Sequence, residues 1–239
     1  MRDIQMKKQF LVIALLAAGM ALSACGGGGG DDPAPAPPGP VPTGIVKGSA
    51  TKGTVRNAVV EMKQFGSNGQ LINSPLLGTG STDAAGNYIL NYAGYTGGPV
   101  QLCVRTRRSS DNPPTPVTTV VCDATDGTAC GPAPAGGASV GDTDNDQIYD
   151  LGEAIPAPSD FEFCTCLPGP PTGDVRAPIT PFTDLVVQRA AQRDADTALN
   201  ETLAQALLRA ASEINQLAGG VDVLRLEPID LSSSAERAA

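Results

Sequence analysis

Oxygen-bearing side chains recur at regular intervals between residues 142 and 153 of this 239-residue chain. Counted from the first of them, they stand at positions 1, 3, 5, 9 and 12, and the backbone carbonyl of Ile148 falls at position 7. The side chains are those of Asp142, Asp144, Asp146, Asp150 and Glu153. Calcium-binding loops of twelve residues supply oxygen ligands from these same positions. Without a cation the clustered carboxylates would repel one another, so the spacing predicts a structural calcium site.

Two features of this segment depart from the EF-hand, in which a helix precedes and follows the calcium loop. Position 6 of that motif is a glycine at a sharp turn, whereas this chain has Gln147, and a non-glycine residue takes left-handed backbone angles at a cost of about 1 kcal/mol. The stretch before Asp142 is rich in proline and glycine and predicts no helix. We therefore expect a lone loop that resembles the calcium repeats of bacterial and thrombospondin-type surface proteins. A solvated acidic turn is the alternative.

The first 25 residues have the three parts of an export signal. A basic start precedes an apolar run over residues 10–21, which is shorter than the roughly 20 residues that span a bilayer. The segment then ends in the letters LSAC, with Cys25 last. This ending resembles the lipobox of bacterial lipoproteins. The resemblance implies cleavage after Ala24 and attachment of a lipid such as palmitate to Cys25, and an ordinary cleaved signal is the alternative.

The lipobox resemblance also implies a location in the cell. Gly26 follows Cys25, where lipoproteins retained at the inner membrane have an aspartate, so we expect an outer-membrane protein that contacts the membrane through its lipid anchor. Residues 25–43 are rich in glycine and proline. Such a composition cannot bury a core, and it predicts a tether between the anchor and a folded body.

Composition restricts the possible functions. The chain contains no histidine, which removes the commonest general base and the most frequent zinc ligand. Its net charge of −9 argues against nucleic acid as a partner, because phosphates require a basic surface. We therefore expect a protein that is not an enzyme and does not bind nucleic acid.

Five cysteines follow the anchor, and export favours disulfides over metal thiolates. Cys122 and Cys130 enclose a loop of seven residues and are the favoured pair. Cys103 is expected to pair with either Cys164 or Cys166. Either pairing leaves one thiol free.

Residues 44–170 contain short β-prone runs separated by glycine-rich turns, which predicts an antiparallel β-sandwich. Within them the segment TDAAGNY, from Thr82 to Tyr88, resembles the T-D-x-x-G-x-Y/F signature of carboxypeptidase regulatory-like domains, which are transthyretin-like β-sandwiches. We expect Asp83 to bond to the turn amides, Gly86 to reverse the chain and Tyr88 to enter the core. The resemblance covers about residues 44–105, and it implies a structural or binding module without catalytic residues.

Helical patterns begin in the region 171–239. Thr180 and Pro181 are typical of a helix start, and we expect a second helix with Asn200 as its cap and Gly219 at its end. The apolar face of this second helix consists of Leu203, Leu207, Ala210, Ile214 and Leu217. The predicted fold is mainly β, an antiparallel sandwich followed by a C-terminal helical pair, and α+β overall. A serine-capped start near residue 232 suggests that the sequence is part of a longer protein.

The combined features predict a cell-surface lipoprotein that acts as a binding or scaffolding module with structural calcium. A glycan or another envelope protein is the expected kind of partner. One alternative is the accessory region of a larger secreted hydrolase whose catalytic part lies outside this sequence. The other is a spacer that holds a distal domain away from the membrane.

Overall fold

The computed structural model describes residues 43–66, 70–112, 115–124, 129–133, 141–168, 174–196 and 198–227. The predicted signal peptide (1–24), Cys25 and the tether up to residue 42 lie outside these ranges, as does the suspected third helix after residue 227. Among the helices in these ranges, none is long and apolar enough to cross a bilayer.

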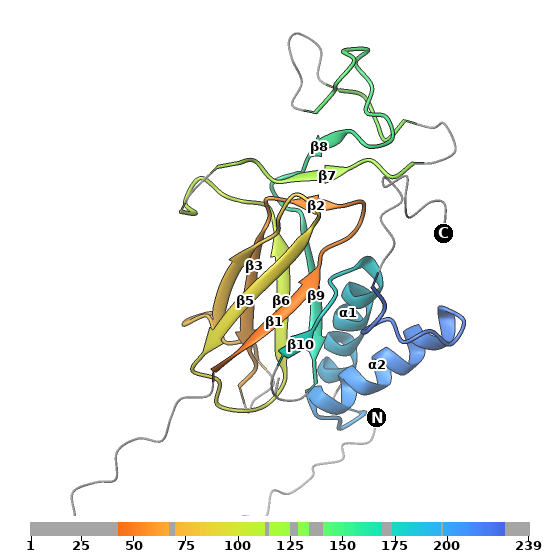
Figure 1. The fold of residues 1–239 in the computed structure, drawn as a ribbon. Coiled ribbons are helices and arrows are strands. Elements are labelled where there is room, and N and C mark those ends of the chain that lie inside the picture. The colour runs from red at the N-terminus through yellow and green to blue at the C-terminus, as the bar shows by residue number, and fades with distance from the viewer. Residues whose placement is uncertain are drawn as a thin grey trace, which may run out of the picture. The chain divides into compact units, whose positions relative to one another are not determined.

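Within the described ranges, ten strands form three sheets (Figure 1). The first sheet has the order β10-β1-β5, with β1 (Thr43–Ser49), β5 (Asn87–Ala93) and β10 (Asp174–Arg176). The second has the order β4-β3-β6-β9, with β3 (Val59–Gln64), β4 (Gly78–Ser81), β6 (Val100–Arg105) and β9 (Glu162–Leu167). A small third sheet joins β2 (Val55–Arg56), β7 (Thr119–Val121) and β8 (Ala154–Pro156). Neighbouring strands are antiparallel except β1 and β10, which are parallel.

The two larger sheets enclose the main core, which confirms the predicted β-sandwich. Alternation along β5 is complete, because Tyr88, Leu90 and Tyr92 are buried while the residues between them are exposed. The inward side chains of β3 and β6 belong to the same core cluster, and they are Val60, Met62, Val100, Leu102 and Val104. Burial of these apolar side chains from two facing sheets is the main stabilising contribution to the sandwich.

The turn between β4 and β5 has the predicted local chemistry. The Asp83 carboxylate accepts hydrogen bonds from the backbone amides of Ala85 and Asn87, each at 2.8 Å. Gly86 has a φ of +76°, which reverses the chain, and Tyr88 enters the core directly afterwards. These contacts explain the T-D-x-x-G-x-Y pattern physically.

Two helices follow the strands, α1 (Pro181–Ala195) and α2 (Leu203–Leu217). The hydroxyl of the predicted cap Thr180 accepts a hydrogen bond from the Thr183 amide, and the Thr183 hydroxyl accepts one from the Thr180 amide. The prediction of Asn200 as the second cap is wrong, because Thr202 occupies that position. Thr202 and Gln205 form a reciprocal capping box that satisfies two backbone amides, an arrangement that Asn200 cannot make with the residue three positions later.

The helical pair packs against β9 at the side of the sandwich (Figure 1). The Thr183 hydroxyl donates to the Cys164 carbonyl at 3.0 Å, and the Cys164 amide donates to the Asp184 carboxylate at 2.9 Å. The second core cluster comprises Cys166, Val186, Ala190, Leu203, Ala206, Leu207, Ala210, Ala211, Ile214 and Val223. Leu217, expected on the buried face of α2, is 84% exposed, since burial along that face ends at Ile214.

Replacement of Gly48 by alanine tests the close approach of β1 to its neighbours. A Cβ at this position would overlap the carbonyl oxygen of Ala177 and lie 2.8 Å from the Tyr88 hydroxyl, which donates to that same carbonyl. We expect Gly48→Ala to lower the free energy of unfolding by about 1 to 3 kcal/mol. Urea denaturation measures this loss. The partly exposed Ser49→Ala on the same strand is the control, and equal stability of the two variants would contradict the prediction.

Candidate metal site

The acidic loop brings three of its carboxylates together. Oxygens of Asp142, Asp144 and Asp146 all lie within 4.8 Å of one another. The Asp142 carboxylate accepts from the amide of Asn145 at 2.7 Å, and the Asp146 carboxylate accepts from the amide of Ile148 at 2.8 Å. Each side chain therefore folds back onto the loop, and three negative oxygens are held at a spacing that one cation can bridge. Hard oxygen donors of this kind suit calcium or magnesium.

Gln147 adopts the conformation that calcium loops normally assign to glycine. Its φ is +71°, and Asn145 has a φ of +62°. The Gln147 amide donates to Asp142 at 3.2 Å, and its carbonyl accepts from the amide of Ala133 at 2.8 Å. These two hydrogen bonds offset the cost of about 1 kcal/mol of a left-handed non-glycine residue. The departure from glycine thus leaves the expected turn intact.

Asp150 and Glu153 have different environments in the same loop. Partial desolvation raises the pKa of Asp150, whose side chain is exposed, and the negative charges of Asp146, Asp144, Glu153 and Asp142 raise it further. A cation bound in the loop would offset the repulsion from these four carboxylates.

Glu153 closes the loop onto its own beginning. Its carboxylate accepts from the hydroxyl and the amide of Thr143, each at 2.6 Å, and from the amide of Asp150 at 2.9 Å. The Thr143 hydroxyl is the largest cause that lowers the pKa of Glu153, followed by the two amides. Of the predicted donors, three aspartates are therefore grouped and Asp150 lies near them. Glu153 instead links Thr143 to Asp150, which are positions 2 and 9 of the loop.

A disulfide braces the second half of this loop. Cys122 and Cys130 are bonded, as predicted. The Cys122 amide donates to the Glu153 carbonyl at 2.8 Å, and the Cys122 carbonyl accepts from Gly152 at 2.9 Å. The Cys130 amide donates to the Tyr149 carbonyl at 2.8 Å. Both half-cystines are therefore joined to residues 149–153, which the sequence spacing did not reveal.

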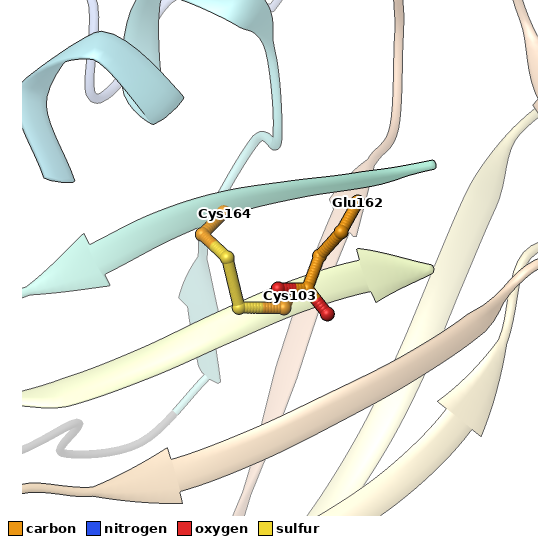
Figure 2. Close-up of side chains that lie close together, drawn as sticks. All are labelled: Cys103, Glu162 and Cys164. Atoms are coloured by element: carbon orange, nitrogen blue, oxygen red, sulfur yellow. A yellow bond between two sulfur atoms is a disulfide. The ribbon is translucent and has the colours of Figure 1, made fainter. Parts of the chain in front are cut away.

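A second group of potential ligands does not form a metal site. Cys103, Glu162 and Cys164 lie together on β6 and β9 (Figure 2). The two sulfurs are joined in a disulfide, so neither is a thiolate that could bind a metal. Cys103 and Cys164 face each other directly in the strand register, and Cys166 faces Gln101 instead. The register therefore decides between the two pairings that the sequence left open.

The remaining thiol is Cys166, which is buried beneath the helices. Burial raises the pKa of this thiol, and the negative charge of Asp184 adds to the effect. A thiol in this environment stays protonated and unreactive at neutral pH. Its role is packing between β9 and the helical pair.

Comparisons with known proteins give little additional information. Models of protein families find no match in the chain, and no curated protein matches it. Among solved structures, a Pseudomonas aeruginosa protein described as a candidate carbohydrate-binding protein shares 8% identity and a TM-score of 0.26. The match covers 59% of this chain and 89% of that one. A likeness at this level assigns neither a family nor a function.

Proposed function

We propose that the chain is a lipid-anchored lipoprotein of the bacterial outer membrane whose folded domain is a non-enzymatic binding or scaffolding module ordered by calcium. The observation that best supports the calcium part is the grouping of Asp142, Asp144 and Asp146 within 4.8 Å. Asp150, Glu153 and the carbonyl of Ile148 complete the proposed ligand set.

The proposed role of the ion is structural. The loop is already held by the Cys122–Cys130 disulfide and by its own hydrogen bonds, so the ion adds order to an existing turn. Extracellular modules bind calcium with dissociation constants of about 10⁻⁴ to 10⁻³ M. An ion at ten times its dissociation constant contributes only about 1.4 kcal/mol to stability. This contribution is enough to hold residues 141–153 in one conformation.

Calcium is expected to raise the melting temperature of the wild-type protein by about 4 °C when it is present at ten times its dissociation constant. Asp144→Asn replaces a charged ligand by a neutral carbonyl oxygen and removes one repelling charge, so calcium should raise its melting temperature less than that of the wild type. In a chelator the variant should be at least as stable as the wild type, because repulsion is reduced. Thermal unfolding followed by circular dichroism measures both quantities. Asp160→Asn, at an exposed aspartate outside the loop, is the control. The test concentration is 10 mM calcium chloride, about ten times the weaker dissociation constant. An unchanged wild-type melting temperature at this concentration would refute the site.

The lipid anchor is a separate part of the proposal and rests on the LSAC ending at Cys25. In a bacterial host we expect the wild-type chain to incorporate a palmitate analogue and to sediment with outer membranes. Cys25→Ala should abolish both, because no other sulfur lies at the lipobox position. Gly28→Ala, in the same tether, serves as the control. Continued labelling of the Cys25→Ala protein would show that the lipobox interpretation is incorrect.

A further inference from the structure

A groove with a volume of about 930 Å³ lies where the sandwich meets the helical pair. One wall comes from the end of β3, with Gln64 and Phe65, and another from the connection between β5 and β6, residues 96–99. The third wall combines the end of α1, with Asp194, and the start of α2. None of the residues proposed for calcium or lipid attachment contributes to it. The groove is therefore independent of the sites described above.

The walls of the groove are preformed. The Gln64 side chain donates to the Thr96 hydroxyl at 2.9 Å and accepts from the Thr96 amide at 3.3 Å. The Tyr95 hydroxyl donates to the Gly98 carbonyl at 2.5 Å, which fixes the same connection from its other side. The Phe65 amide also donates to the Pro99 carbonyl at 3.1 Å. A ligand would thus meet a groove that needs little ordering, which favours affinity.

The charge of the lining disfavours anionic ligands. Asp194 and Glu201 line the groove, and no lysine or arginine does so among the residues described. The Glu201 carboxylate forms ion pairs with Arg193 at 2.8 Å and with Arg209 at 3.0 Å, and neither arginine lines the groove. Asp194 is partly buried and makes no side-chain hydrogen bond or ion pair with the rest of the described chain. It is therefore a free acceptor facing the groove.

The combination of side chains suits a polyhydroxylated ligand. Carboxylate, amide and hydroxyl groups can exchange hydrogen bonds with neighbouring sugar hydroxyls, and they are supplied by Asp194, Gln64 and Thr96. Phe65, Pro99 and Leu203 add apolar surface for the C–H face of a sugar ring.

Few other aromatic rings on the described surface could serve the same purpose. All four tyrosines are buried. The rings of Phe161 and Phe163 pack against each other with their centroids 5.0 Å apart, and the Lys52 ammonium lies over the ring of Phe163. Phe182 on α1 is 49% exposed but does not line the groove. Phe65 is thus the aromatic ring that lies beside polar acceptors in a concave surface.

We propose that this groove binds a neutral glycan chain, with Asp194 and Gln64 as hydrogen-bonding residues and Phe65 as the stacking surface. The inference rests on the proposed binding role of the module and names the site and the ligand class for it. It does not depend on the calcium loop, because the two sites share no residue.

The test is titration of the full chain, solubilised in detergent, with three neutral hexasaccharides: chitohexaose, cellohexaose and maltohexaose. At least one should bind in microscale thermophoresis, and a hyaluronan hexasaccharide, which is anionic, should bind at least about tenfold more weakly. Asp194→Ala and Phe65→Leu should each weaken binding about tenfold or more. Phe65→Leu retains an apolar side chain, so the packing of the second core is largely preserved.

Matched controls make the outcome decisive. Phe182→Leu removes an exposed aromatic ring outside the groove, and Asp160→Ala removes an exposed carboxylate elsewhere. Both should bind as the wild type does, and circular dichroism should show all variants to be folded. Absence of binding to every neutral hexasaccharide, or equal losses in the groove and control variants, would overturn the assignment. Those results would leave the calcium response and the membrane anchor intact, so failure of the groove is distinguishable from failure of the proposed function.

Discussion

Simultaneous replacement of Cys103 and Cys164 by alanine is expected to lower the free energy of unfolding by about 4 kcal/mol. The disulfide joins residues 61 positions apart, and a cross-link restricts the unfolded chain more strongly as its loop lengthens. The bond also holds β6 against β9, whose Cys164 backbone contacts Thr183 and Asp184 of α1. Its removal should therefore loosen the helical pair as well as the sheet.

The matched comparison is removal of the Cys122–Cys130 disulfide. These residues are only 8 positions apart, so the same chain-entropy relation gives a cost of about 2.5 kcal/mol. Urea denaturation under non-reducing conditions measures both losses, and hydrogen exchange locates them. Amides of α1 should lose protection in the first variant, whereas the amide of Tyr149 should lose it in the second. A larger cost for the shorter loop would contradict this account.

Replacement of Arg105 by leucine is expected to cost about 3 to 5 kcal/mol at neutral pH. Arg105 is 7% exposed and lies between two carboxylates. Its guanidinium donates to Glu61 at 2.6 and 2.9 Å and to both oxygens of Asp111 at 2.8 and 2.9 Å. Leucine would leave two negative charges poorly hydrated and close together. That situation is more costly than the loss of an exposed ion pair.

The pH dependence of this cost has a defined sign. Hydrogen bonds from Arg105 are the largest cause that holds the pKa of Asp111 below its usual range. For Glu61, burial alone would raise the pKa, but the hydrogen bonds and charge of Arg105 lower it overall. Carboxylates with lowered pKa values stabilise the fold above their unfolded pKa of about 4 and lose this contribution as pH falls through the folded value. Wild-type stability should therefore decrease from pH 5 toward pH 2.

In Arg105→Leu the contribution of Glu61 and Asp111 should change in the opposite direction over the same range. Without the guanidinium, burial favours the neutral forms of Glu61 and Asp111, so acidification relieves their repulsion. The stability difference between wild type and variant should shrink between pH 7 and pH 3, as measured by urea denaturation at each pH. The triple variant Arg105→Leu, Glu61→Leu, Asp111→Asn should recover much of the loss at pH 7, because neither carboxylate is left without the guanidinium. Lys63 loses its 3.4 Å ion pair with Glu61 in this variant, so the recovery should be incomplete. A constant difference at all pH values would show that lost packing is the cause.

The local parts of this protein could be predicted because their signals lie within a few residues. Alternation along β5, the Asp83–Gly86 turn and the Thr180 cap each depend on side chains that bond or bury within one element. The close spacing of Cys122 and Cys130 was likewise sufficient to identify their disulfide. The second helix cap was wrong by two residues because two polar side chains compete there, and the reciprocal bonds of Thr202 and Gln205 decide the outcome.

Long-range arrangement required the tertiary structure. Asp111 follows Arg105 by only six positions, but Glu61 lies 44 positions away on another strand. A charged residue at the end of a strand gives no indication of such a distant partner. The groove is similar, because Gln64, Thr96 and Asp194 become neighbours only when a strand end, a loop and a helix end meet. The parallel pairing of β10 with β1 also brings a strand from beyond residue 170 into the sandwich.

The sequence alone determined the fold class, the local turns and the candidate ligands of the acidic loop, because periodicity and spacing are properties of neighbouring residues. The tertiary structure decided which cysteine is the partner of Cys103, since strand register places Cys164 opposite it and places Cys166 opposite Gln101. It also showed that three aspartates converge while Glu153 bonds to Thr143. These outcomes depend on contacts between distant segments, which are set by packing and register and not by the order of residues in any one stretch.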